Sequence, residues 1–272
     1  LIKSIPVWSN GSAGQMYAHA TVCMGWRMLK DEGKVTGLAA HGKYNDKLYK
    51  QINRIFHYDN NFGFSPGDSP GKTAFLLNPL NLSQSSFSDK ADAAFNIQLV
   101  IENELSKLLN HLNKIYPDYK NVVLVGGLFA NVKLNQRINN LEWVKEVFVF
   151  PPMGDDGLSL GAALTLAYHK GERETKRLDN VFFGSSYSNQ EIEEASCTTS
   201  GAPAFVQEPY DPDSLAKRIE EGQIIGWFQG RFEHGPRALG ARSIVVKSTD
   251  PNAHELLNNR LGRHEIMPSL LS

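Results

Sequence analysis

Two short runs of β-branched and aromatic residues, each followed at once by a break and a helical segment, constrain the fold of this chain most. The first run is Asn121–Val125, which ends in Gly126 and Gly127, and the second is Glu146–Phe150, which ends in two prolines. Both have the length and composition of buried strands. Because short connections and a helix separate them, we expect adjacent, parallel strands in an α/β layer.

Helical patterns flank these strands. Apolar residues recur at steps of three and four from Ala91 to Leu112, which predicts an amphipathic helix. Asn131 is suited to cap the helix after the first strand, and residues 158–169 are helical again. By contrast, residues 58–88 are rich in Asn, Ser, Gly and Pro, which predicts a loop or an extended insertion.

The C-terminal part begins a new α/β unit. Asp211 and Pro212 form an N-cap and first-turn pair for a helix that ends near Gly222. Strands are expected at 223–228 and 243–247, and a further helix opens at Asp250-Pro251. The polar, charged segment 169–180 separates this unit from the preceding one. We therefore expect two domains, residues 1–178 and residues 179–272.

Composition excludes some classes of function. The 272 residues are 41% apolar, and 28 basic against 29 acidic residues leave a net charge of −1. This balance argues against bulk binding to nucleic acid or to a membrane surface. No run approaches the ~18 apolar residues that cross a bilayer, and no export signal is present, so we expect a cytoplasmic protein. Both ends look cut, and we expect a fragment of a longer chain.

The strand ends carry two candidate phosphate sites. Gly126 and Gly127 permit close backbone approach, and the next helix offers unpaired N–H groups to a phosphate, although such junctions are often only tight connections. Asp155 and Asp156, before Gly157, could hold a divalent cation, or could simply cap the helix that follows. Because strand ends of one sheet converge on a single crevice, the two junctions together favour nucleotide binding.

A third candidate is the run FQGRFEHGPRALGARS. It holds Arg231, Arg237 and Arg242 among glycines and a proline. Arginine forks bind phosphate or carboxylate oxygens in bidentate fashion, which predicts an anion site. A solvated basic turn would not need Gly-Pro geometry around each arginine. Glu233 could orient an arginine, and His234 could donate to a phosphate.

Taken in order, four runs resemble the NodU/CmcH/TobZ family of O-carbamoyltransferases. They are GKVTGLAAHG, GGLFANVKLNQRI, PPMGDDGLSLGAAL and GWFQGRFEHGPRALGARSI. The first contains Lys34, which by itself is only a weak phosphate candidate. The last match is long and specific, and the resemblance covers nearly the whole chain from Gly11 onward.

The resemblance implies the fold and the chemistry. It implies α/β architecture: the end of an actin-like ATPase (Kae1-like) domain followed by a partial YrdC-like domain. The second domain would make carbamoyl adenylate from carbamoyl phosphate and ATP, and the first would pass the carbamoyl group to a hydroxyl of a small molecule. Family members serve antibiotic and nodulation-factor pathways, and the acceptor and the oligomeric state stay open.

The resemblance also implies roles for single residues. Gly126, Gly127, Asn131, Asp156 and Gly157 would bind the nucleotide. The metal, iron or magnesium, would be bound by Asp155. The carbamoyl-phosphate and adenylate site would contain Arg231, Arg237 and Arg242, which would neutralise charge that develops on phosphoryl oxygens.

The chain departs from the family pattern in its metal ligands. The family's remaining ligands are a pair of histidines in an HxxxH motif, which this sequence lacks, and His234 replaces a phenylalanine. Two alternatives therefore stay open beside the carbamoyltransferase. One is a related ATPase, of the threonylcarbamoyl tRNA-modifying or sugar-kinase type, although a kinase has no need of the arginine loop. The other is a catalytically silent, truncated binding module.

Overall fold

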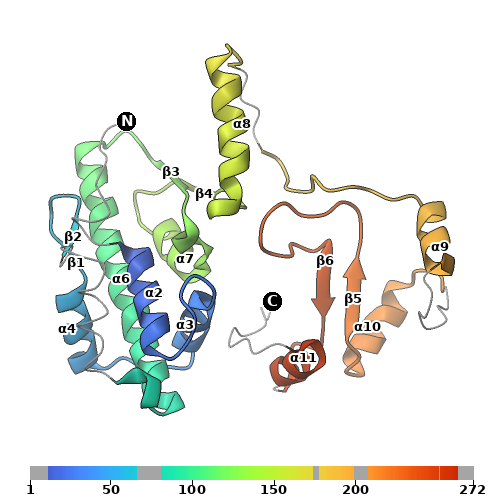
Figure 1. Cartoon of the computed structure of the whole chain (residues 1–272), viewed down its shortest axis with the longest axis horizontal. Helices are drawn as coiled ribbons and strands as arrows, with labels where there is room; N and C mark the ends of the chain where they lie inside the picture. Colours follow the sequence, from blue (N-terminus) through green and yellow to red (C-terminus); the bar gives the residue numbers. More distant parts are fainter. Residues whose placement is uncertain (1–11, 66–80, 174–177, 199–207, 251, 263–272) are drawn as a thin grey trace. The chain divides into compact units, whose positions relative to one another are not determined.

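The computed structural model confirms a mixed α/β chain and describes residues 12–65, 81–173, 178–198, 208–250 and 252–262 (Figure 1). Within these ranges the chain divides into two compact units, one up to Asp155 and the other from Asp156 onward. The predicted domain boundary at residues 178 and 179 stays a prediction. Among the described helices, none combines the length and the apolar character that crossing a bilayer requires.

Helices dominate the first unit: α2 (Ala13–Cys23), α3 (Glu32–Ala39), α4 (Asp46–Ile55) and α6 (Phe87–Ile115). The long helix α6, drawn in green, contacts the other three in Figure 1. Its buried apolar positions follow the three- and four-residue steps of the sequence: Ala91, Ala94, Ile97, Ile101 and Leu105. The predicted amphipathic helix is therefore confirmed, and its stripe is the centre of the hydrophobic core.

Helix α6 begins earlier than predicted because Ser86 caps it. The Ser86 hydroxyl accepts from the Asp89 amide at 3.1 Å and donates to the Asp89 carboxylate at 2.7 Å. The helix thus starts inside the segment predicted to be a loop.

At its other end, the segment predicted to be a loop or an extended insertion contains a short hairpin. There β1 (His57–Tyr58) pairs antiparallel with β2 (Phe64–Ser65), and a short 3₁₀ turn, η2 (Leu82–Gln84), precedes the cap of α6. Residues 66–80 lie outside the described part of the chain.

Residues 33–42, which by themselves were a weak candidate for phosphate binding, take part in packing. Gly42 follows α3 where the chain meets α6, and a Cβ there would lie 2.0 Å from the Ala91 carbonyl oxygen. Only glycine fits this close approach. Lys34 Nζ, in turn, pairs with Asp31 at 3.0 Å. The side chains of this run therefore serve the first unit's own packing.

The α/β layer of the first unit is as predicted. Strands β3 (Asn121–Leu124) and β4 (Glu146–Val149) are parallel, in a register that pairs Asn121 with Glu146. The 3₁₀ turn η3 (Gly127–Ala130) and helix α7 (Val132–Asn139) connect them. Each strand ends one residue short of its predicted limit.

The remaining elements follow along the chain, and apart from Asp155 they belong to the second unit. A 3₁₀ turn, η4 (Asp155–Gly157), leads into α8 (Leu158–His169), and α9 (Asn189–Thr198) follows. The other elements are α10 (Pro212–Glu220), β5 (Ile225–Phe228), β6 (Arg242–Val245) and α11 (Ala253–Leu261). β5 and β6 are antiparallel, and Figure 1 shows the long loop that joins them at one end of the pair.

Local signals predicted the start of α10 better than that of α11. The Asp211 carboxylate accepts from the amides of Asp213 and Ser214, as predicted for an N-cap followed by proline. Helix α11, however, begins at Ala253 rather than at Asp250, whose carboxylate instead accepts from the Asn252 amide within a turn.

Candidate functional site

The two strand-end junctions of the first unit lie side by side. Gly126 has φ of 110°, a conformation that favours glycine, and its N–H donates to the Met153 carbonyl at 2.6 Å. This bond links the Gly-Gly turn after β3 to the segment after β4, two residues before Asp155. The convergence expected of parallel strands is confirmed for this pair of turns.

The glycine turn presents open backbone. Gly126 and Gly127 are exposed, and an added Cβ at either would meet no other atom within 4 Å. The Gly126 amide is already used, so a ligand would approach the amides of the following turn. Binding of a nucleotide there stays a prediction.

Asn131 caps α7, as predicted, and also joins three elements. Its Oδ1 accepts from the Leu134 amide at 3.1 Å and from Gln98 Nε2 at 3.3 Å. Its Nδ2 donates to Tyr17 Oη at 2.9 Å and to Gln98 Oε1 at 2.8 Å. Both lone-pair sites and both N–H groups of this 7%-exposed amide are therefore used within the protein.

Asn131 is part of a buried polar cluster that the sequence analysis missed. The Tyr17 hydroxyl donates to Gln98 Oε1, and Gln98 Nε2 donates to Glu102 at 2.8 Å. Burial and then the Glu102 charge raise the pKa of Tyr17, so its hydroxyl stays protonated as a donor. The signal was present, because Gln98 and Glu102 lie beside the apolar stripe of α6 at the spacing of one helical turn.

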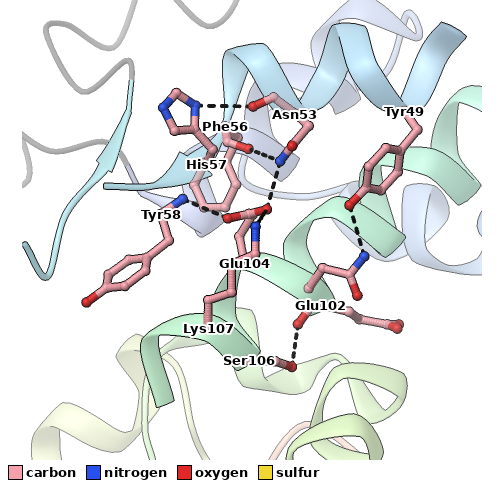
Figure 2. A network of polar contacts seen from close by, with 10 residues as sticks. Tyr49, Asn53, Phe56, His57, Tyr58, Glu102, Glu104, Ser106 and Lys107 are labelled. Atoms are coloured by element: carbon pink, nitrogen blue, oxygen red, sulfur yellow. Dashed lines mark hydrogen bonds and ion pairs between the residues drawn. The ribbon is translucent and has the colours of Figure 1, made fainter. Parts of the chain in front are cut away.

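A second buried polar cluster surrounds Glu104 (Figure 2). Its fully buried carboxylate accepts from Asn53 Nδ2 at 2.8 Å, from Lys107 Nζ at 2.7 Å and from the Tyr58 amide at 2.8 Å. These bonds attach α4 and β1 to α6. Glu104 follows Ile101 by three residues, on the apolar side of the helix, and this position could have identified it. We assign it a structural role.

Asp155 and Asp156 are both exposed, and neither caps α8. The N-cap position is Gly157, and it makes no side-chain cap hydrogen bond. The alternative of simple helix capping is thus not what the structure shows. Within the described ranges, no group of three or more His, Cys, Asp or Glu side chains could hold a metal ion. Asp155 as a metal ligand stays a prediction.

The loop between β5 and β6 is built around Arg242. Its Nη1 donates to the carbonyls of Gln229 and Ala241, both at 2.8 Å, and its Nη2 donates to the Gly230 carbonyl at 3.0 Å. The guanidinium carbon lies 3.4 Å from the ring centre of Phe228, within cation–π range. Arg242 therefore holds both ends of the loop together.

Glu233, which is negatively charged, binds backbone N–H groups of the same loop. One carboxylate oxygen accepts from the amides of Leu239, Ala241 and Arg242, at 2.8, 2.7 and 3.1 Å. Desolvation raises the pKa of Glu233, but these amides outweigh it and hold the pKa at about 2. Glu233 was expected to orient an arginine side chain, and it orients the backbone instead.

Arg231 and Arg237 lie on the same loop, and both are exposed. Guanidinium groups bind phosphate or carboxylate oxygens, so both exposed arginines stay candidates for the predicted anion site. The structure therefore separates the three predicted arginines into two exposed residues and one that holds the loop.

A further segment supports the loop from one side. The His234 amide donates to the Val181 carbonyl at 2.7 Å, and the Gly184 amide donates to the Phe232 carbonyl at 3.1 Å. A Cβ at Gly184 would lie 2.3 Å from Phe232 Cβ, so glycine permits this contact. The His234 ring lies against Phe183, and its predicted donation to a phosphate stays a prediction.

Comparison with known proteins gives the family. The family model for the carbamoyltransferase N-terminus matches residues 2–164, which include both strand-end junctions. The chain belongs to the carbamoyltransferase family. The model for the carbamoyltransferase C-terminus matches residues 216–270, which include the arginine loop. The predicted resemblance to NodU- and CmcH-type proteins is confirmed.

Three relatives place this carbamoyltransferase-family chain among longer proteins. It is 30% identical to protein MJ1058 of Methanocaldococcus jannaschii, over 94% of this chain and 43% of the relative. It is 29% identical to the nodulation protein NolNO of Sinorhizobium fredii, over 96% and 39%. It is 25% identical to the 3'-hydroxymethylcephem-O-carbamoyltransferase of Streptomyces clavuligerus, over 98% and 50%. The chain thus spans half or less of the length of these relatives.

Proposed function

We propose that this chain is part of an O-carbamoyltransferase. It would activate the carbamoyl group of carbamoyl phosphate with ATP, as carbamoyl adenylate, and pass that group to a hydroxyl of a small molecule. The observation that carries the proposal is the loop from Gln229 to Arg242, which holds Arg231 and Arg237 exposed on a scaffold of internal hydrogen bonds. The family match over this loop supports the same conclusion.

The loop would bind the negatively charged phosphoryl group of the substrate. Carbamoyl phosphate and the adenylate both carry phosphoryl oxygens, and guanidinium groups placed on one loop can neutralise such charge. Arg231 and Arg237 are the residues that we assign to this contact. Hydrolysis of carbamoyl phosphate would give carbamate and phosphate. A carbamate oxygen would then attack the α-phosphorus of ATP, which forms carbamoyl adenylate and releases pyrophosphate. Attack of a substrate hydroxyl on the carbonyl carbon of this adenylate would release AMP.

ATP would be bound at the glycine turn after β3. We assign its phosphates to the open backbone at Gly126 and Gly127. Asn131 would support this site by fixing the first turn of α7, because its own amide is fully hydrogen-bonded. In this proposal residues 1–178 are the end of a Kae1-like domain and residues 179–272 begin a YrdC-like domain.

A bound metal ion is a weaker part of the proposal. Asp155 is a suitable oxygen ligand, but the described residues do not offer the three or more donor side chains of a protein-held metal site. We therefore derive no step through a metal.

The acceptor is a hydroxyl on a small molecule. Two relatives are named for a hydroxymethyl group of a cephem, and this is the chemical class that we carry over. The proposal places the reaction in the cytoplasm, where ATP is available.

The test is pyrophosphate release by the purified protein. Supplied with ATP and a magnesium salt, it should release pyrophosphate only when carbamoyl phosphate is also present. Arg237→Ala should abolish this release and leave the circular dichroism spectrum unchanged. The matched control is Arg54→Ala, an exposed arginine on α4, which should release pyrophosphate at the wild-type rate. Turnover that survives Arg237→Ala would sink the assignment of the loop.

A further inference from the structure

The loop from Gln229 to Arg242 contains two oppositely charged side chains that both bind backbone. The Glu233 carboxylate accepts from three amides, and the Arg242 guanidinium donates to three carbonyls. Ordering such a long hairpin connection costs conformational entropy, so a fixed shape needs hydrogen bonds of this kind to offset that cost. The shape of the loop is therefore held by a negatively charged and a positively charged side chain that both belong to the loop.

The carboxylate fills what would otherwise be an anion site. Three N–H groups, from Leu239, Ala241 and Arg242, converge on one oxygen of Glu233. Concave sets of backbone N–H groups of this kind bind phosphate in other proteins. Here the anion is internal, so an incoming phosphate meets no vacant amides at these three positions.

The guanidinium ties the opposite ends of the loop. Arg242 reaches the carbonyls of Gln229 and Gly230 across the base of the loop, and its carbon lies 4.2 Å from the ring centre of Phe232 as well as over Phe228. Gly230, with φ of 55°, adopts the left-handed conformation that turns its carbonyl. A lysine could not make this planar set of contacts.

We propose that Glu233 and Arg242 are positioning residues that fix the shape of the loop, so that Arg231 and Arg237 alone among its arginines contact the anionic substrate. The part of this proposal that concerns the substrate rests on the proposed function. The part that concerns the loop does not, since it follows from the hydrogen bonds within the second unit.

The same geometry argues against an alternative role for Glu233, that of a general base. A carboxylate in a substrate loop could be a general base, and that role needs a pKa near the working pH and a free lone pair aimed at the substrate. Three amides already converge on one oxygen of Glu233, and its pKa is held at about 2. A carboxylate of this kind stays charged at neutral pH and transfers no proton there.

The loop itself is tested by NMR on ¹⁵N-labelled protein. Glu233→Ala should shift and broaden the amide signals of Leu239, Ala241 and Arg242, and Glu233→Gln should shift them less, because its amide oxygen still accepts. The matched controls are Glu193→Ala and Glu193→Gln, at an exposed glutamate on α9. Unchanged signals in Glu233→Ala would overturn the loop part of the proposal, whatever the activity of the protein.

The substrate part is tested by binding and kinetics with carbamoyl phosphate. Glu233→Ala should raise the KM for carbamoyl phosphate by on the order of tenfold or more, with Glu233→Gln between it and wild type. Arg242→Lys should behave as Glu233→Ala does. The pH profile of Glu233→Gln between pH 5 and 9 should keep the wild-type shape. A lost limb of that profile would make Glu233 a proton-transfer group and contradict positioning.

The NMR experiment and the carbamoyl phosphate experiments test the loop positioning and the proposed function separately. If wild-type protein neither binds carbamoyl phosphate nor depends on it, the proposed function fails while the NMR experiment still decides the shape of the loop. If wild type binds it and Arg242→Lys keeps wild-type affinity with unshifted amide signals, the function stands and the positioning role of Arg242 is wrong.

Discussion

At the scale of single residues, the carboxylate of Glu233 sets the pH range over which the arginine loop keeps its shape. Its pKa in the folded protein is about 2, below the ordinary value of 4.5. A carboxyl group whose pKa is lowered on folding stabilises the fold above its unfolded pKa and loses that contribution as pH falls toward the folded value.

We therefore predict that the loop stays ordered well below pH 4.5. The amide shifts of Leu239 and Ala241 should titrate with a midpoint near pH 2, as long as the rest of the second unit remains folded. A titration of these amides by two-dimensional NMR checks this. A midpoint near 4.5 would mean that Glu233 does not bind the amides in solution.

The amide of Asn131 gives a second prediction at this scale. Asn131→Ala removes a helix cap and takes one buried hydrogen-bond partner from each of Gln98 and Tyr17, so we expect a loss of about 2–4 kcal/mol of stability. The matched control is Asn45→Ala, at the exposed N-cap of α4, which accepts only from the Leu48 amide and should cost about 1 kcal/mol. Urea denaturation measures both. Equal losses would show that the cross-links from Asn131 add nothing to its cap.

At the scale of elements, the chain after α3 approaches α6 closely because Gly42 has no side chain. Gly42→Ala would place a Cβ 2.0 Å from the Ala91 carbonyl oxygen and should destabilise the protein by about 1–3 kcal/mol. Gly33→Ala, at an exposed position of α3 where an added Cβ would meet no atom within 4 Å, should stabilise the protein by about 0.5–1 kcal/mol. Thermal unfolding of the two variants compares them directly. A neutral Gly42→Ala would mean that the helices approach less closely than described.

Elements with strong local signals were predictable from the sequence. The strands β3 and β4 have β-branched runs with Gly or Pro stops, and α10 has an Asp-Pro start, so each was placed within two residues. Helices α2 to α4 were not predicted. α2 has small, polar and apolar residues in no clear helical pattern and is buried along most of its length, so only its tertiary contacts mark it as a helix.

The candidate site was predictable in part for the same reason. Residue type identified arginines, glycines and aspartates that suit phosphate chemistry. It could not show that Arg242 would bind carbonyls or that Glu233 would bind amides. Those roles depend on the path of the backbone between β5 and β6, which no short motif determines.

At the scale of the whole molecule, helix α8 is apolar but none of its residues is buried. Leu158, Leu164, Leu166 and Tyr168 are 57–68% exposed. Exposed apolar surface of this kind binds hydrophobic dyes. The double variant Leu158→Lys and Leu166→Lys should therefore reduce the fluorescence of added anilinonaphthalene sulfonate at equal protein concentration. Unchanged fluorescence would show that α8 is covered in solution.

In the proposed function, the second unit handles a phosphoryl anion in an adenylation reaction. The most direct measurement is the exchange of radiolabelled pyrophosphate into ATP, without any hydroxyl acceptor. We predict exchange only when carbamoyl phosphate is present, lost in Arg237→Ala and retained in Arg54→Ala. Exchange that needs no carbamoyl phosphate, or that Arg237→Ala leaves intact, would contradict the account.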